Sequence, residues 1–80
     1  MGGPGWAVQV GSFASQDNAN RLAEKLRSAG LSAYIEQRPE QSGTVFKVRV
    51  GPQPGRAEAE QMRATLAQRF GLDGMLLQQP

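Results

Sequence analysis

The side chains that could do chemistry in this chain alternate with apolar residues in two short, similar segments. Gln9 lies between two valines near the start of the chain, and Lys47 and Arg49 flank a third valine further on. Among the 80 residues there is no cysteine and no histidine, which removes the usual nucleophile and base pairs and the usual zinc ligands. An amide and two cations spaced along strands suit hydrogen bonding and charge pairing. We therefore expect a binding protein that is not an enzyme and uses no cofactor or metal.

A near repeat indicates the elements that position these side chains. Residues 8–11 (VQVG) return as residues 48–51 (VRVG), and each copy runs into an amphipathic helical segment that ends at a Gly-Leu pair. A strand, helix, strand unit written twice in a small chain predicts a split βαβ fold. We expect an α+β fold of order βαββαβ, with a four-stranded antiparallel sheet and both helices on one face. The other face of the sheet is then open.

The expected boundaries follow from turn signals and apolar periodicity. Strands are predicted at residues 6–11, 31–37, 44–50 and 74–78, and the segment 38–43, which contains Pro39 and Gly43, is predicted to be a loop. Residues 1–5 are expected to be a tag remnant or the end of a linker, so that residues 6–80 form one domain. No apolar run is long enough to span a membrane.

Alternation within the expected strands assigns side chains to the open face. That face is predicted to carry Gln9, Tyr34, Val45, Lys47 and Arg49, with Ser12 and Phe13 at its rim. The set offers an amide, a hydroxyl, a ring and two cations, which suits a sugar polymer that carries carboxylates. The last strand could face either way, because residues 75–77 are all apolar.

The same segments resemble the SPOR domain from Trp6 onward. The resemblance is carried mainly by Gln-Val-Gly-Ser-Phe at residues 9–13 and by Arg-Val-Gly-Pro at residues 49–52, with matching alanines and leucines in both helical segments. The two motifs at this separation are fairly specific for the family, whereas either motif alone would be weak evidence. Residues 71–76 and the aliphatic Val45 are most similar to the DedD type of this domain.

The resemblance implies a function at the bacterial cell wall. SPOR domains bind septal peptidoglycan, with a preference for glycan strands that have been denuded of their stem peptides, and many are periplasmic modules of division proteins. We therefore expect a periplasmic, septal domain of a larger membrane-anchored or exported protein. We also expect it to be a monomer and to bind no nucleic acid, with any membrane anchor outside this chain.

The resemblance also implies particular glycan contacts. The family's contact positions fall on Gln9, Ser12, Lys47 and, in the last strand, near Leu76. The family's open-face aromatic falls on Val45, where this chain departs from the pattern and loses a ring that could stack on a pyranose. Tyr34, which parity places across the sheet, is a candidate for the missing stacking surface.

Some of these residues have a simpler interpretation. Phe13 could equally pack into the core, and Ser12 could help to cap the first helix. Tyr34 and Arg49 could be plain surface residues of an exposed strand.

A single-stranded RNA-binding domain of the RRM type is the alternative function, because it has the same element order and also binds through its open sheet. It needs aromatic residues at outward positions of the first and third strands, where RNA bases stack. Those positions hold Gln9, Lys47 and Arg49 here, and Phe46 points to the core by parity. The formal net charge of +2 is also too small to indicate a nucleic-acid surface.

Overall fold

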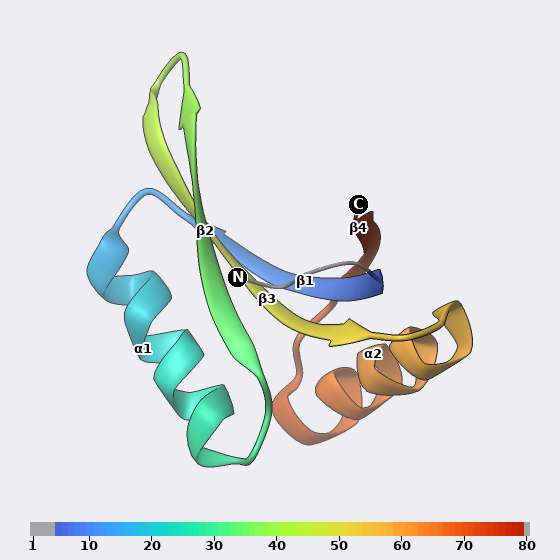
Figure 1. Ribbon diagram of the computed structural model, residues 1–80. Coiled ribbons are helices and arrows are strands. Elements are labelled where there is room, and N and C mark those ends of the chain that lie inside the picture. The colour runs from blue at the N-terminus through green and yellow to red at the C-terminus, as the bar shows by residue number, and fades with distance from the viewer. Residues whose placement is uncertain (1–4, 80) are drawn as a thin grey trace.

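The computed structural model describes residues 5–79, which form one four-stranded antiparallel sheet with two helices on one face (Figure 1). The elements are, in chain order, β1 (Gly5–Phe13), α1 (Gln16–Ser28), β2 (Ala33–Glu40), β3 (Gly43–Gln53), α2 (Arg56–Phe70) and β4 (Met75–Gln79). The strands lie in the order β2-β3-β1-β4. The βαββαβ fold and the antiparallel sheet are thus confirmed. Residues 1–4 of the expected tag or linker segment lie outside the described residues, and Gly5 belongs to β1.

The helices begin and end where local chemistry favours it. The Ser15 side chain accepts a hydrogen bond from the backbone N–H of Asn18 and so caps α1. α2 begins after Gly55 without a side-chain cap, and it ends at Gly71, whose φ of 66° is left-handed and suits glycine. Both helices therefore have ends that the sequence marks.

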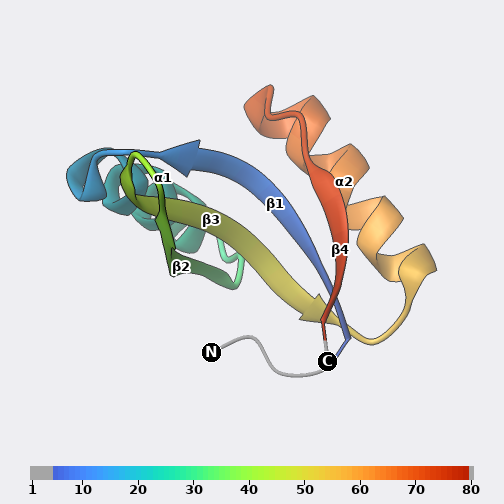
Figure 2. The ribbon, with the colours of Figure 1, turned by 90° about the horizontal axis from the view of Figure 1, so that it is seen from above.

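The core lies between the helices and one face of the sheet. Val8, Val48 and Val50 are fully buried there against Leu26 of α1 and Leu66 of α2. Seen from above, α1 lies beneath the β2–β3 side of the sheet and α2 beside β1 and β4 (Figure 2). Because both helices cover this face of the sheet, the opposite face is available for other contacts.

The segment expected to be a loop at residues 38–43 is instead the end of a long hairpin. β2 continues to Glu40 and β3 begins at Gly43, so that only Gln41 and Ser42 form the turn. The φ of Gly43 is +120°, a conformation that glycine adopts readily, and Pro39 lies in an edge strand, where proline is tolerated. The hairpin therefore projects beyond the helices, as Figure 1 shows.

A β-bulge in β1 changes the parity that the sequence suggests. Gln9 pairs with Arg49, but Gly11 pairs with Val48 and Ser12 with Lys47, so β1 contains one more residue than β3 in this stretch. The extra residue turns Ser12 to the same face as Gln9 and turns Phe13 to the face of Phe46. A regular strand would have placed Gln9 and Ser12 on opposite faces.

A second irregularity lies where β3 passes the start of β1. The register shifts between Trp6 and Val8, and β3 continues through Pro52 to Gln53, beyond the expected end at Val50. Gly51 has a φ of +148°, and a Cβ there would lie 3.0 Å from the Trp6 backbone oxygen and 3.2 Å from the Ala7 Cα. The two strands can approach this closely only because residue 51 has no side chain.

This contact predicts a large difference between two glycine substitutions. Gly30 also has a positive φ, of +87°, but a Cβ there would meet nothing within 4 Å. We expect Gly30→Ala to lower the free energy of unfolding by about 1 kcal/mol, and Gly51→Ala to lower it by about 1–3 kcal/mol more, because of the added clash with backbone atoms. Urea denaturation of both variants checks this, and equal losses would contradict the close approach.

Candidate functional site

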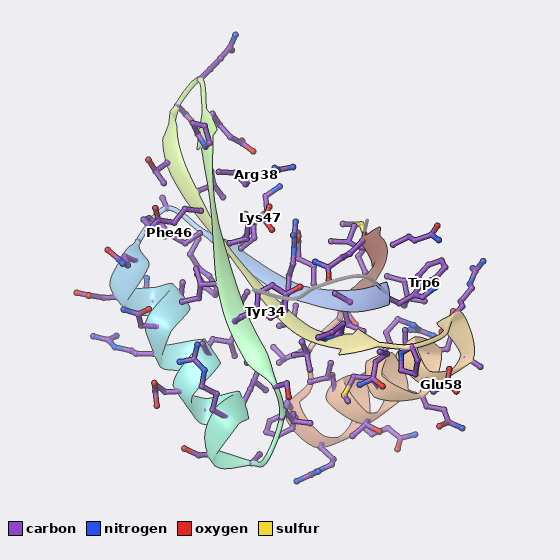
Figure 3. The ribbon with its side chains drawn as sticks, in the orientation of Figure 1. Trp6, Tyr34, Arg38, Phe46, Lys47 and Glu58 are labelled. Atoms are coloured by element: carbon purple, nitrogen blue, oxygen red, sulfur yellow. The ribbon has the colours of Figure 1, made fainter. Side chains whose placement is uncertain are left out.

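The face of the sheet turned away from the helices carries most of the residues predicted to bind ligand. Strand pairing aligns Gln9 of β1 with Arg49 of β3, and Arg49 with Tyr34 of β2. Ser12 and Lys47 pair next to them, and Val45 follows further along the hairpin opposite Arg38. In Figure 3, Arg38 and Lys47 project from the upper part of the sheet, whereas Phe46 points toward α1. We call this surface the open face.

Arg49 does not extend freely from the open face, although parity places it there. Its residue exposure is 8%, and its guanidinium group donates from Nη1 to Glu36 Oε1 at 2.7 Å and from Nε to Gln9 Oε1 at 3.2 Å. These contacts link β3 to both of its neighbouring strands. The prediction that Arg49 is an exposed cation is therefore wrong, because two side chains of adjacent strands enclose it.

Tyr34 is also buried on this face, with an exposure of 7%. Its hydroxyl accepts a hydrogen bond from Gln79 Nε2 at 2.7 Å, across the width of the sheet. Ala7, on the same face of β1, is fully buried. The Tyr34 ring is thus part of the support of the face, and it does not offer the wide exposed surface that stacking on a sugar would use.

The more accessible polar groups lie toward the hairpin. Ser12 is exposed, and Gln9 and Lys47 are half-buried. The Lys47 ammonium lies 3.9 Å from Glu40 Oε2, and the Lys47 side chain retains 23% of its exposure. An amide, a hydroxyl and an ammonium therefore lie on neighbouring positions of β1 and β3, where they can donate to and accept from a ligand laid on the sheet.

A hollow of about 400 Å³ opens on this face between β2 and β4. It is lined by Glu36, Arg38, Arg49, Leu77, Gln78 and Gln79. Among the residues that the structure describes, the Gln79 Oε1 atom is buried without a hydrogen-bond partner. The hollow thus combines charged groups of β2 and β3 with amide and apolar groups of β4.

Two residues predicted to contact ligand lie on the core side. Phe13 pairs with Phe46 beyond the bulge, and Leu76 pairs with Val8; both pack against the hydrophobic core. The pairing resolves the parity of β4, since Met75 is opposite Gln9 and Leu77 is opposite Ala7. The apolar residues that β4 turns to the open face are therefore Met75, which is 55% exposed, and Leu77.

Sequence reasoning did not assign Glu36, Arg38 or Gln79 to the site. Alternation along β2 places Glu36 on the open face, so parity together with the position of Arg49 could have suggested their ion pair. Gln79 lies beyond the expected end of the last strand, and no pattern in the sequence indicates its contact with Tyr34.

The structure gives no indication of a metal centre or a membrane span within residues 5–79. No group of three or more Asp and Glu side chains there is arranged to hold a metal ion. Neither α1 nor α2 is long and apolar enough to cross a membrane.

Comparison with known proteins identifies the family. The chain matches the SPOR domain over residues 2–78 and belongs to that family of septal peptidoglycan-binding domains. It is 28% identical over 75 residues to the cell division protein DedD of Escherichia coli (strain K12), a match that covers 94% of this chain and 34% of that protein. The chain therefore spans about a third of the length of this relative.

Two solved structures are similar to the whole fold. The crystal structure of the RlpA SPOR domain from Pseudomonas aeruginosa superposes with a TM-score of 0.82 at 24% identity, covering 94% of this chain and all of that chain. A structure of the SPOR protein DedD superposes with a TM-score of 0.70 at 30% identity, covering 95% of this chain and 39% of that chain. The predicted resemblance to the SPOR domain, including the DedD relationship, is confirmed.

The contacts of Arg49 predict a structural role that Lys47 does not share. Replacing Arg49 with methionine removes the donor that Glu36 and Gln9 share, so we expect Arg49→Met to lower the free energy of unfolding by about 1–3 kcal/mol. Lys47→Met also removes one positive charge from the same face of β3, but the ion pair with Glu40 that it breaks is long and partly exposed. We therefore expect Lys47→Met to change the free energy of unfolding by less than about 1 kcal/mol. Thermal and urea unfolding check this, and equal effects would show that the Arg49 contacts contribute nothing particular.

Proposed function

We propose that this chain binds peptidoglycan glycan strands through the open face, without catalysis, and prefers strands denuded of stem peptides. The observation that carries the proposal is the arrangement of Gln9, Ser12 and Lys47 on adjacent positions of β1 and β3 in a chain of the SPOR family. The β1 bulge brings the first two side chains to one face. In this proposal the domain directs a larger periplasmic protein to the division septum.

The chemistry of the ligand suits these groups. A denuded strand carries a lactyl carboxylate on every second sugar, with hydroxyl and acetamido groups between the charges. Lys47 can pair with such a carboxylate, and Gln9 and Ser12 can hydrogen-bond the neutral groups, for a net gain of about 0.5–1.5 kcal/mol per hydrogen bond. An exposed ion pair adds about 0.2–1 kcal/mol. Modest affinity at one site would be raised by repeated sites along the strand.

Single-stranded RNA binding remains the second candidate function, since the fold leaves the same face open. That mode of binding relies on rings that stack with bases. Within the described part of the open face the ring comes from Tyr34, which is buried and hydrogen-bonded to Gln79. These observations favour the glycan.

The direct test is binding of the isolated chain to purified sacculi before and after amidase treatment. We expect the bound fraction to rise after treatment, because amidases remove stem peptides and expose the glycan carboxylates. An unstructured RNA added at physiological salt should not compete. Binding that is indifferent to amidase treatment, or that RNA abolishes, would contradict the proposal.

A pair of serine variants serves as the control in this experiment. Ser12→Ala removes an exposed hydroxyl from the open face, and Ser28→Ala removes one from the last turn of α1. Loss of one hydrogen bond predicts about two- to tenfold weaker binding for Ser12→Ala and no change for Ser28→Ala. Both substitutions are at exposed positions and should alter stability by less than about 0.5 kcal/mol.

Val45 is the position of the open face at which a substitution should tighten glycan binding. Val45→Trp would place a ring near Lys47, where it could lie on the apolar face of a pyranose. Roughly 40 Å² of additional buried apolar area corresponds to about 1 kcal/mol, or about fivefold tighter binding. Thr44→Trp adds the same ring on the opposite face of the hairpin and is the matched control. Titration with denuded glycan measures both, and equal affinities for the two variants would remove residue 45 from the site.

A further inference from the structure

The three cations Arg38, Lys47 and Arg49 of the open face pair with two carboxylates of β2. Arg49 lies 2.7 Å from Glu36 Oε1, Arg38 lies 3.4 Å from Glu36 Oε2, and Lys47 lies 3.9 Å from Glu40. One carboxylate thus holds two guanidinium groups, each through a different oxygen. Lys47 has the longest of these ion pairs.

Glu36 also lies where a ligand would approach. It lines the hollow together with both arginines, so a carboxylate that entered would meet the negative charge of Glu36 as well as the guanidinium groups. Displacing Glu36 from Arg49 would break a charge-assisted hydrogen bond in a poorly solvated place, since the Arg49 side chain is 9% exposed. The free energy gained by binding an anion at this end of the open face is therefore small.

The other polar side chains of the hollow, those of Gln78 and Gln79, are uncharged amides. Gln79 uses its amide nitrogen to donate to the Tyr34 hydroxyl, and its Oε1 is buried without a partner among the described residues. Gln78 is exposed, and an uncharged amide can hydrogen-bond hydroxyl and acetamido groups but forms no ion pair with a carboxylate.

We propose that Glu36 is a specificity-determining residue that pairs with both Arg38 and Arg49 and offsets one of their two positive charges, so that the hollow accepts neutral sugar groups and gives carboxylates little advantage, while the ligand's carboxylates are met at Lys47. This inference rests on the proposed function and names which parts of the glycan the two ends of the open face recognise. It predicts that the unmodified chain discriminates only weakly between charged and neutral glycans, despite three cations on the face.

The test compares two oligosaccharides of equal length by calorimetric or NMR titration. One is a neutral N-acetylglucosamine oligomer, and the other is a denuded fragment in which alternate sugars carry the lactyl carboxylate. Glu36→Gln keeps the shape of the side chain but frees both guanidinium groups. We expect it to bind the anionic fragment about three- to tenfold more tightly, with a steeper salt dependence, and the neutral oligomer within about twofold of the parent.

Two further variants keep the test decisive. Glu24→Gln makes the same change in net charge on α1, where Glu24 pairs with Arg27, and should leave the affinities for both ligands unchanged. Adding Arg38→Gln to the Glu36→Gln chain removes the more exposed of the two freed guanidinium groups, so most of the gain in affinity for the anionic fragment should be lost.

The inference is overturned if Glu36→Gln strengthens the binding of both ligands alike, if Glu24→Gln reproduces its effect, or if the double variant keeps the full gain in affinity for the anionic fragment. In these cases binding of the parent chain to sacculi would still support the proposed function. If the parent binds neither oligosaccharide nor sacculi, the proposed function fails and the inference fails with it.

Discussion

The open face depends on the buried guanidinium group of Arg49. It joins Gln9 of β1 to Glu36 of β2, and so fixes side chains of three adjacent strands on a surface that no helix covers. A buried charge must be paired and hydrogen-bonded to be tolerated, and these two partners satisfy that requirement. The same contacts fix the Gln9 amide on the open face and keep the arginine from acting as a free cation. Structural support of the open face thus comes from one group, and the proposed role of Glu36 in ligand selection depends on its pairing with that group.

The β1 bulge contributes the second constraint. Without the extra residue, the spacing of three between Gln9 and Ser12 would direct the two side chains to opposite faces. With it, both lie beside Lys47 and Arg49, while Phe13 turns into the core against Phe46. A local irregularity of the backbone therefore determines which polar groups share the open face.

The sequence predicted the secondary-structure elements. It also predicted on which face of the sheet a side chain lies, wherever the strand is regular. The repeated strand segments and the helical stripe of Ala19, Ala23 and Leu26 are enough to indicate the fold, because burial follows their period. The hairpin extension was missed because Pro39 and Gly43 are turn signals that an edge strand also accommodates. Long-range contacts such as Tyr34 with Gln79 depend on how the sheet twists and curves, which the residue pattern does not specify.

The central claim is that the open face, and not the helices, binds the glycan. The most direct measurement is a titration of the isotopically labelled chain with amidase-denuded glycan strands, followed by amide and side-chain NMR shifts. The account predicts a continuous set of shifted signals that includes Gln9, Ser12 and Lys47, with the signals of Leu26 and Leu66 unmoved. Shifts that cluster on α1 and α2, with these open-face signals unchanged, would contradict it.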